Sequence, residues 1–305
     1  MADVSFRASQ GANKRKTYFL LASMGALVWL VVFAALTYFG KSTTAIVPIA
    51  VGIALISVWG SYYASDSIVL RMTGAREIAQ SDNPNLFNLI QEVTIASGLP
   101  MPKVAIVQDS APNAFATGRN PEHAVIAFTT GILEVMDRDQ LQGVIAHEMS
   151  HVGNRDTLVA AVATTTAGAI AILSDILTRM MWFGGGRRDN RDSNSNPLAL
   201  IVSLVVLILA PIAALLLKSA ISRRREALAD ATAVAFTRNP AGLRSALEVL
   251  AANTTVVQQR STAVAHIWIE SPLDAKSVSR LFATHPPIEE RIAALRAMES
   301  LGPST

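Results

Sequence analysis

Residues 137–154 read DRDQLQGVIAHEMSHVGN, and positions 147–151 within this stretch form an HExxH pattern. Asp137, followed three residues later by Gln140, predicts the start of a helix, with Asp in place of the usual Ser or Thr of a capping box. Apolar residues then recur at spacings of three and four, which predicts a helix with one face on a core. They are Leu141, Val144, Ile145 and Val152.

On such a helix His147 and His151 lie one turn apart on the same face, so two imidazoles can bind one metal ion. Glu148 is rotated by about 100° from His147 and can reach a water molecule on that metal without being a ligand itself. This is the layout of a zinc hydrolase with a general base. The pattern also occurs by chance on amphipathic helices, but two of the chain's five histidines stand here, in an otherwise apolar stripe.

A third ligand is expected downstream, where residues 222–230 read SRRREALAD. Because a carboxylate is the expected third partner of a His-His zinc site, with water in the fourth position, Glu226 is the candidate. Asp230, one helical turn further on, can then accept a hydrogen bond from a ligating imidazole and fix its tautomer. The alternative is a charged helix start outside a membrane, with Glu226 paired to a neighbouring arginine. The chain has no cysteine, which excludes thiolate metal sites and disulfides.

The composition is that of an integral membrane protein. Hydrophobic residues make up 51% of the 305 residues and charged residues only 16%, against roughly 25% charged in soluble domains. The formal net charge of +3 could suggest a nucleic-acid partner. However, the basic residues cluster at the ends of apolar blocks, where contact with a lipid bilayer explains them better. No nucleic-acid partner is therefore expected.

Four apolar segments predict transmembrane helices in two hairpins. Residues 17–39 and 43–64 carry no charge, and the first of them is longer than a signal-peptide core and lacks a clear cleavage site. In the second hairpin, residues 198–217 are also free of charge, whereas 157–174 is rich in Ala and Thr and is the less clear span. The polar loop between them, 184–196, is expected to be mobile and solvated.

The sequence therefore predicts a mainly α fold with a small β-sheet. We expect four transmembrane helices in two hairpins and a zincin-like HExxH catalytic domain. The predicted parts are a basic tail (1–16), transmembrane hairpin 1 (17–64), a catalytic part with the sheet and the HExxH helix (65–156), transmembrane hairpin 2 (157–221) and a catalytic part with the third ligand and C-terminal helices (222–305).

Within the first catalytic part, Asn83-Pro84 predicts a helix start and Gly98 its end, and 103–107 and 124–128 predict strands. Between them we expect an edge strand beside the HExxH helix, formed by Asn113, Ala114, Phe115, Ala116 and Thr117. An exposed edge there can bind an extended peptide through backbone hydrogen bonds without demanding a sequence. The alternative is that this segment is no more than a hairpin arm.

The predicted topology tests the metal site. Two crossings between His151 and Glu226 return the chain to its starting side, so the two halves of the site can meet, whereas one or three would separate them. Basic residues are more frequent on the catalytic side than in the opposite loops, and the positive-inside rule then places the N-terminus and the active site in the cytoplasm. The three arginines of loop 184–196 oppose this assignment.

The HExxH pattern at 147–151, followed after a membrane hairpin by Glu226-xxx-Asp230, resembles the HtpX family of membrane-bound zinc metallopeptidases. These enzymes are related to the prenyl-protein (CAAX) endopeptidases and the mitochondrial Oma-type proteases. The resemblance extends to residues 113–118, 283–287 and 290–292 and covers nearly the whole chain. It implies a zinc metalloendopeptidase of the bacterial cytoplasmic (inner) membrane. Its polypeptide substrates would be damaged or misfolded membrane proteins, degraded in a stress response.

Carried over by residue, the resemblance implies that His147, His151 and Glu226 bind one zinc ion, with Glu148 as the base. It also implies that Asp230 supports His147 and that Asn113, Ala114, Phe115 and Ala116 bind substrate backbone. His285, in a His-Pro-Pro turn, would face the site and stabilise the oxyanion; a helix-capping or core position is the alternative. Arg291 would hold this turn or pair with a site carboxylate, and we expect its role to be structural.

Two other functions stay open at this point. One is a dedicated processing peptidase of the CAAX-endopeptidase type, although such relatives have more membrane spans than the four expected here. The other is a non-catalytic membrane scaffold that has retained HExxH by accident. The sequence predicts no oligomeric state.

Overall fold

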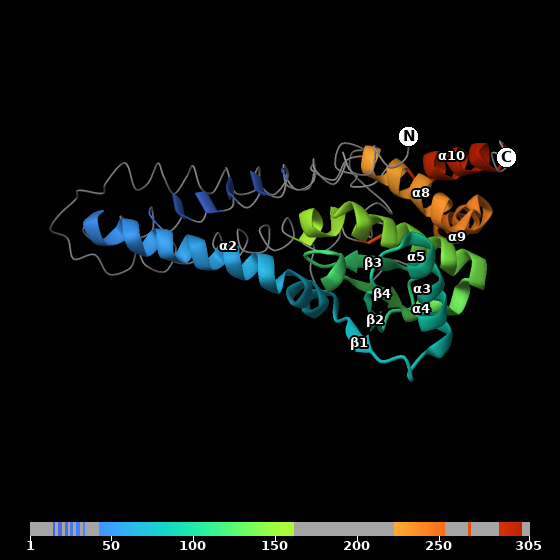
Figure 1. Cartoon of the computed structure of the whole chain (residues 1–305), viewed down its shortest axis with the longest axis horizontal. Coiled ribbons are helices and arrows are strands. Elements are labelled where there is room, and N and C mark those ends of the chain that lie inside the picture. The colour runs from blue at the N-terminus through green and yellow to red at the C-terminus, as the bar shows by residue number, and fades with distance from the viewer. Residues whose placement is uncertain are drawn as a thin grey trace, which may run out of the picture.

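The computed structural model describes residues 43–161, 223–253, 268–269 and 287–300, with isolated positions between 15 and 33. Helices predominate in these parts and surround one small β-sheet, which confirms the predicted mainly α fold class. The long helix α2 (Thr43–Thr73) points away from the region that contains the sheet and the shorter helices (Figure 1).

Helix α2 includes the predicted second span, 43–64. Among the residues that the structure describes, however, no helix meets the combined requirements of length and hydropathy for crossing a membrane. The spans predicted at 17–39, 157–174 and 198–217 lie wholly or mostly outside the described residues, as does loop 184–196.

The sheet has four strands in the order β1-β2-β4-β3. Strand β2 pairs in parallel with β4, while β1 and β3 add antiparallel strands at the two edges. Their bounds are β1 (Arg76–Ile78), β2 (Lys103–Val107), β3 (Ala114–Thr117) and β4 (Val125–Thr129). The strands predicted at 103–107 and 124–128 are thus present, the second shifted by one residue, and β3 is an edge strand as expected. Two short elements, η1 (Pro121–His123) and α4 (Thr130–Val135), flank β4.

Helix α3 (Pro84–Ser97) follows the signals in its sequence. The Asn83 side chain accepts a hydrogen bond from the Leu86 amide at 3.1 Å, and Gly98, with φ 68°, ends the helix in the left-handed conformation that glycine adopts at low cost. Its buried side chains face the core: Leu86, Leu89, Ile90 and Val93.

Helix α5 (Arg138–Asn154) carries the HExxH pattern and begins with the predicted capping box. The Gln140 amide donates to Asp137 Oδ1 at 2.9 Å, and the Asp137 amide donates to Gln140 Oε1 at 3.0 Å. These reciprocal bonds satisfy backbone donors that a helix start leaves without partners. The apolar face packs in the main core, as the periodicity predicts.

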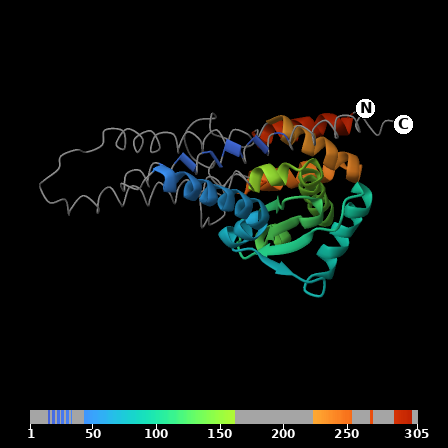
Figure 2. The same ribbon diagram turned by 60° about the vertical axis from the view of Figure 1, so that its left-hand side comes forward.

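Helix α5 lies between the sheet and a layer of α8 (Arg223–Thr237), α9 (Pro240–Ala252) and α10 (Ile288–Ser300), as Figures 1 and 2 both show. The approach to α9 is close at Gly143, where a Cβ atom would stand 2.7 Å from the Leu243 backbone. The absence of a side chain there lets α9 reach α5. The central helix thus contacts both chain segments that contribute to the site.

Candidate metal centre

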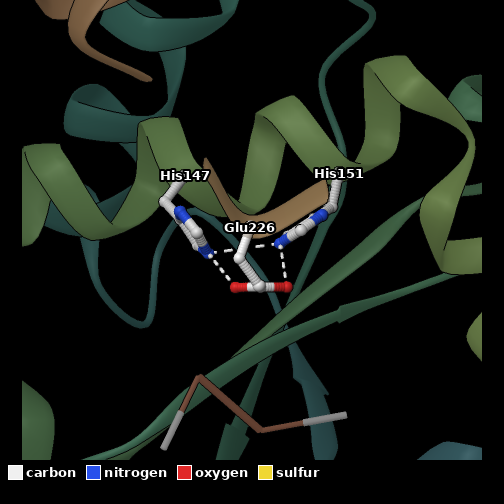
Figure 3. A group of neighbouring side chains, drawn as sticks. All are labelled: His147, His151 and Glu226. Carbon is white, nitrogen blue, oxygen red and sulfur yellow. Dashed lines mark hydrogen bonds and ion pairs between the residues drawn. The ribbon is translucent and has the colours of Figure 1, made fainter. Parts of the chain in front are cut away.

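His147 and His151 project from one face of α5 toward the carboxylate of Glu226, which lies in the first turn of α8 (Figure 3). The two imidazole Nε2 atoms are 3.2 Å apart. Each is also 3.6 Å from a different oxygen of Glu226. His147 and Glu226 are almost fully buried, while the His151 side chain keeps 15% of its surface exposed. Solvent therefore reaches the cluster from the His151 side.

The spacing of these donor atoms fits a tetrahedral zinc ion. Bonds of about 2.0–2.2 Å at tetrahedral angles separate neighbouring ligand atoms by about 3.4 Å. The two Nε2 atoms are 3.2 Å apart, and each lies 3.6 Å from one oxygen of the Glu226 carboxylate, Oε2 for His147 and Oε1 for His151. With one donor atom from each residue, the three atoms lie within 4.8 Å of one another. Two imidazoles and one carboxylate are also the donor set of catalytic zinc sites, which keep a fourth position for water or substrate.

Both imidazoles are held from behind by a carboxylate. His147 Nδ1 is 2.9 Å from Asp230 Oδ1, and His151 Nδ1 is 3.0 Å from Asp156 Oδ2. A histidine that donates its Nδ1 proton keeps the Nε2 lone pair available for a metal. Asp230 lies behind His147, as the resemblance to the HtpX family implies. Asp156 was missed, because residues 155–157 read as the passage from a helix into a membrane span.

Arg291 is also part of this cluster. Its Nε and Nη2 atoms donate to the two oxygens of Asp230 at 2.9 and 2.6 Å, and its Nη1 atom is 3.7 Å from Glu226 Oε2. Pairing with a site carboxylate was one of the two expected roles. Arg291 also lies against His147, with its Nη2 atom 3.3 Å from His147 Nδ1. The sequence pattern did not predict this contact.

The opposite charges of Asp230 and Arg291 stabilise each other in the buried site. Burial alone would raise the pKa of Asp230, but Arg291 and His147 outweigh it and hold that pKa well below its usual range. Burial likewise lowers the pKa of the Arg291 guanidinium, and Asp230 and Glu226 raise it above its ordinary value. Asp230 is therefore ionised and Arg291 protonated, as a buried ion pair requires.

The carboxylates around His151 favour a positive charge on or beside its imidazole ring. Burial lowers the pKa of His151, yet Glu226 and Asp156 outweigh burial and raise the pKa to about 9. A divalent cation would supply the charge that a proton supplies there, and metal binding would release that proton. Glu148 is buried in α5, and its charge contributes to raising the pKa of both His151 and Arg291.

The β3 edge differs from the expectation of an exposed strand. All four residues of β3 are buried, and the Ile269 amide donates to the Ala114 carbonyl at 3.0 Å. Trp268 packs on the Phe115 ring in a T-shaped contact with centroids 4.8 Å apart. The expectation of an open edge was therefore wrong at Ala114, because a segment distant in sequence covers it. His285 lies outside the described residues.

With this geometry in hand, comparison with known proteins identifies the family. Residues 80–299 match the profile of peptidase family M48. The chain belongs to peptidase family M48. This confirms the resemblance to HtpX-like enzymes: M48 membership makes the chain a metallopeptidase, and the His-His-Glu cluster is compatible with its metal.

Similar M48 proteins extend over nearly the whole chain. The protease HtpX homolog of Thermoanaerobacter pseudethanolicus is 43% identical over 291 residues, 95% of this chain and 96% of the relative. The protease HtpX homolog of Streptococcus gordonii is 44% identical over 94% of this chain and 98% of the relative. The crystal structure of S. mikatae Ste24p aligns with a TM-score of 0.47 and 17% identity, over 96% of this chain and 66% of that chain.

Proposed function

We propose that this M48 metallopeptidase is a zinc-dependent endopeptidase that hydrolyses damaged or misfolded membrane proteins as part of a stress response. The observation that carries the proposal is the buried cluster of His147, His151 and Glu226, whose donor atoms all lie within 4.8 Å of one another. Its similarity to protease HtpX homologs over most of its length supports the same function.

The proposed chemistry uses residues of three helices. His147, His151 and Glu226 would hold the zinc ion, which would supply a Lewis acid for a bound water molecule and for the scissile carbonyl. Glu148 takes the proton from the attacking water and delivers it to the leaving amine. Asp230 and Arg291 keep the His147 ring oriented from behind. By its resemblance to the family, His285 would donate a hydrogen bond to the oxyanion.

We propose that the chain crosses the membrane in two hairpins, on the basis of its apolar segments and of the distance between His151 and Glu226. His151 Nε2 is 3.6 Å from Glu226 Oε1, so the chain between them starts and ends on the same side of any bilayer. A hairpin within 157–221 meets this requirement. The hairpin proposed at 17–64 would likewise return the chain to its starting side, so that the N-terminus lies on the catalytic side. The catalytic parts, 65–156 and 222–305, then lie together on the cytoplasmic face of a bacterial inner membrane.

The dedicated CAAX-type processing peptidase is not favoured, because the relatives that match nearly the whole chain are protease HtpX homologs. Membership in peptidase family M48, together with the His-His-Glu cluster, favours an enzyme over a non-catalytic scaffold.

Metal removal tests the proposed function. We expect the purified full chain to cleave β-casein, to lose that activity on treatment with 1,10-phenanthroline and to regain it when zinc is added back. Cleavage that persists after the chelator has removed the metal would contradict a zinc-dependent mechanism. Identification by mass spectrometry of proteins trapped by the Glu148→Gln variant then tests whether its substrates are membrane proteins.

The β3 edge supplies a proposed binding site for substrate backbone. The Asn113 carbonyl accepts from the Thr129 amide and so faces β4, whereas the Ala114 carbonyl accepts from Ile269 and faces away from β4. Because orientation alternates along a strand, the amide and carbonyl of Ala116 face the same outer edge as those of Ala114. We therefore propose that an extended substrate pairs with β3 at Ala116.

A proline at Ala116 removes the outward amide while leaving the β4 ladder intact, since edge strands tolerate proline on this side. We expect Ala116→Pro to lower kcat/KM for β-casein by about 3- to 10-fold, the worth of one hydrogen bond. Its zinc content should stay at the wild-type level. Ala116→Ser, which keeps the amide, is the matched control. Equal kcat/KM in the proline and serine variants would show that substrate does not use this edge.

A further inference from the structure

Asp156 lies directly after the turn that ends the HExxH helix, and it is buried. Helix α5 ends at Asn154, and Arg155 follows in the left-handed conformation with φ 60°. Residues 156–161 are helical again, so that turn places Asp156 at the start of the next helix, where the helix dipole favours a carboxylate. An acidic side chain that only served the helix start could face water, so the burial of Asp156 indicates a further role in tertiary structure.

The two oxygens of Asp156 contact two different parts of the site. Oδ2 is 3.0 Å from His151 Nδ1, and Oδ1 is 3.5 Å from Arg225 Nη1. Arg225 immediately precedes the third candidate ligand, Glu226, in α8. Asp156 therefore connects the end of the HExxH helix with the start of the helix that supplies the carboxylate.

The same turn is fixed to the sheet as well. The hydroxyl of Thr157, the next residue, donates to the Gly118 carbonyl at 3.1 Å, directly after β3. Asp156 thus lies where α5, α8 and the end of the proposed substrate strand meet.

The arrangement repeats the one around the other imidazole. Behind the His147 ring lies Asp230, which contacts Arg291. Behind the His151 ring lies Asp156, which contacts Arg225. Each imidazole therefore contacts an aspartate that is itself paired with an arginine. The two pairs come from different elements, with Arg291 in α10 and Arg225 in α8. The repetition indicates that both rings need the same support.

We propose that Asp156 is a positioning residue for the metal centre. It holds His151 with Nδ1 protonated and Nε2 directed at the metal, and through Arg225 it fixes the first turn of α8 against the end of α5. This inference rests on the zinc site proposed above. A carboxylate in such a position typically contributes about 10- to 100-fold to metal affinity.

Zinc affinity of the full chain, measured by competition with a chromophoric chelator, tests the proposal. We expect Asp156→Asn to weaken zinc binding by about 10- to 100-fold and to shift the ligand-field bands of the cobalt-substituted protein. Asp156→Glu, which restores the charge, should recover part of the affinity. Asp139→Asn, an exposed aspartate on the same helix, is the matched control and should bind zinc like the wild type.

The link to α8 has its own test. Arg225→Gln should weaken zinc binding less than Asp156→Asn, and the double variant should bind no more weakly than Asp156→Asn alone, because Arg225 acts through Asp156. Additive losses would overturn this link. If Asp156→Asn fails to fold, the zinc affinity of Arg225→Gln tests the proposal in its place. An Arg225→Gln variant that binds zinc with wild-type affinity would overturn the proposal.

The outcomes separate this inference from the proposed function. Wild-type protein that binds no zinc would contradict the zinc site itself. Wild-type protein that binds zinc, with a folded Asp156→Asn variant that binds it equally well, would overturn only the positioning role.

Discussion

Replacing Glu148 with glutamine should lower kcat/KM for β-casein cleavage by about 10²- to 10⁴-fold, the usual contribution of a general base. The variant should still bind one zinc ion per chain. Glutamine has nearly the same shape but cannot take a proton from water. Glu148 follows His147 directly in α5, but it is not part of the candidate metal-binding cluster of His147, His151 and Glu226. Its removal therefore affects proton transfer and leaves metal binding in place.

Glu134→Gln provides the matched control for this experiment, because Glu134 is an exposed glutamate in the neighbouring helix α4. It should cleave casein like the wild type. Undiminished proteolysis by a zinc-loaded Glu148→Gln protein would refute the assignment of Glu148 as the base.

The His147→Ala variant should lose zinc. Structural zinc sites bind with about 10–16 kcal/mol, so one of three protein ligands contributes on the order of 3–5 kcal/mol, or about 10²- to 10⁴-fold in affinity. His147 is also the ring that Asp230 and Arg291 surround, so its removal leaves a buried ion pair beside a cavity. Metal analysis of the purified full chain measures the result, and proteolysis should fall with zinc content.

His123→Ala is the corresponding control. His123 is exposed in η1, where its Nδ1 lies 2.6 Å from the Asn120 side chain. This variant should retain one zinc ion and full activity. A His147→Ala protein that keeps zinc at wild-type affinity would show that the metal is bound elsewhere.

Features with local causes could be predicted from the sequence. The start of α5 depends on side chains three residues apart, Asp137 and Gln140, and the ends of α3 depend on Asn83 and Gly98. The two histidines follow from helix geometry alone. Glu226 was a candidate on chemical grounds, because a metal site in a chain without cysteine must use His, Glu or Asp, and a carboxylate is a usual third ligand beside two imidazoles.

Features that depend on contacts between distant segments could not be predicted in this way. The covering of the β3 edge requires Ile269 to meet Ala114, and the support of His151 requires a carboxylate just beyond a helix end to turn back toward it. Neither contact has a periodic or spacing signal. For Arg291 the sequence offered two roles, and only packing of α10 near α8 brings its guanidinium to Asp230.

Joint binding of one metal ion by α5 and α8 is the central claim, and Glu226 is the residue that decides it. The direct measurement is the zinc stoichiometry and affinity of the full chain with Glu226→Gln, compared with wild type and with the exposed-site control Glu122→Gln. We predict one zinc ion per chain in the wild type and the control, and a loss of affinity of about 10²-fold or more in Glu226→Gln. Binding of one zinc ion by Glu226→Gln with wild-type affinity would contradict the account.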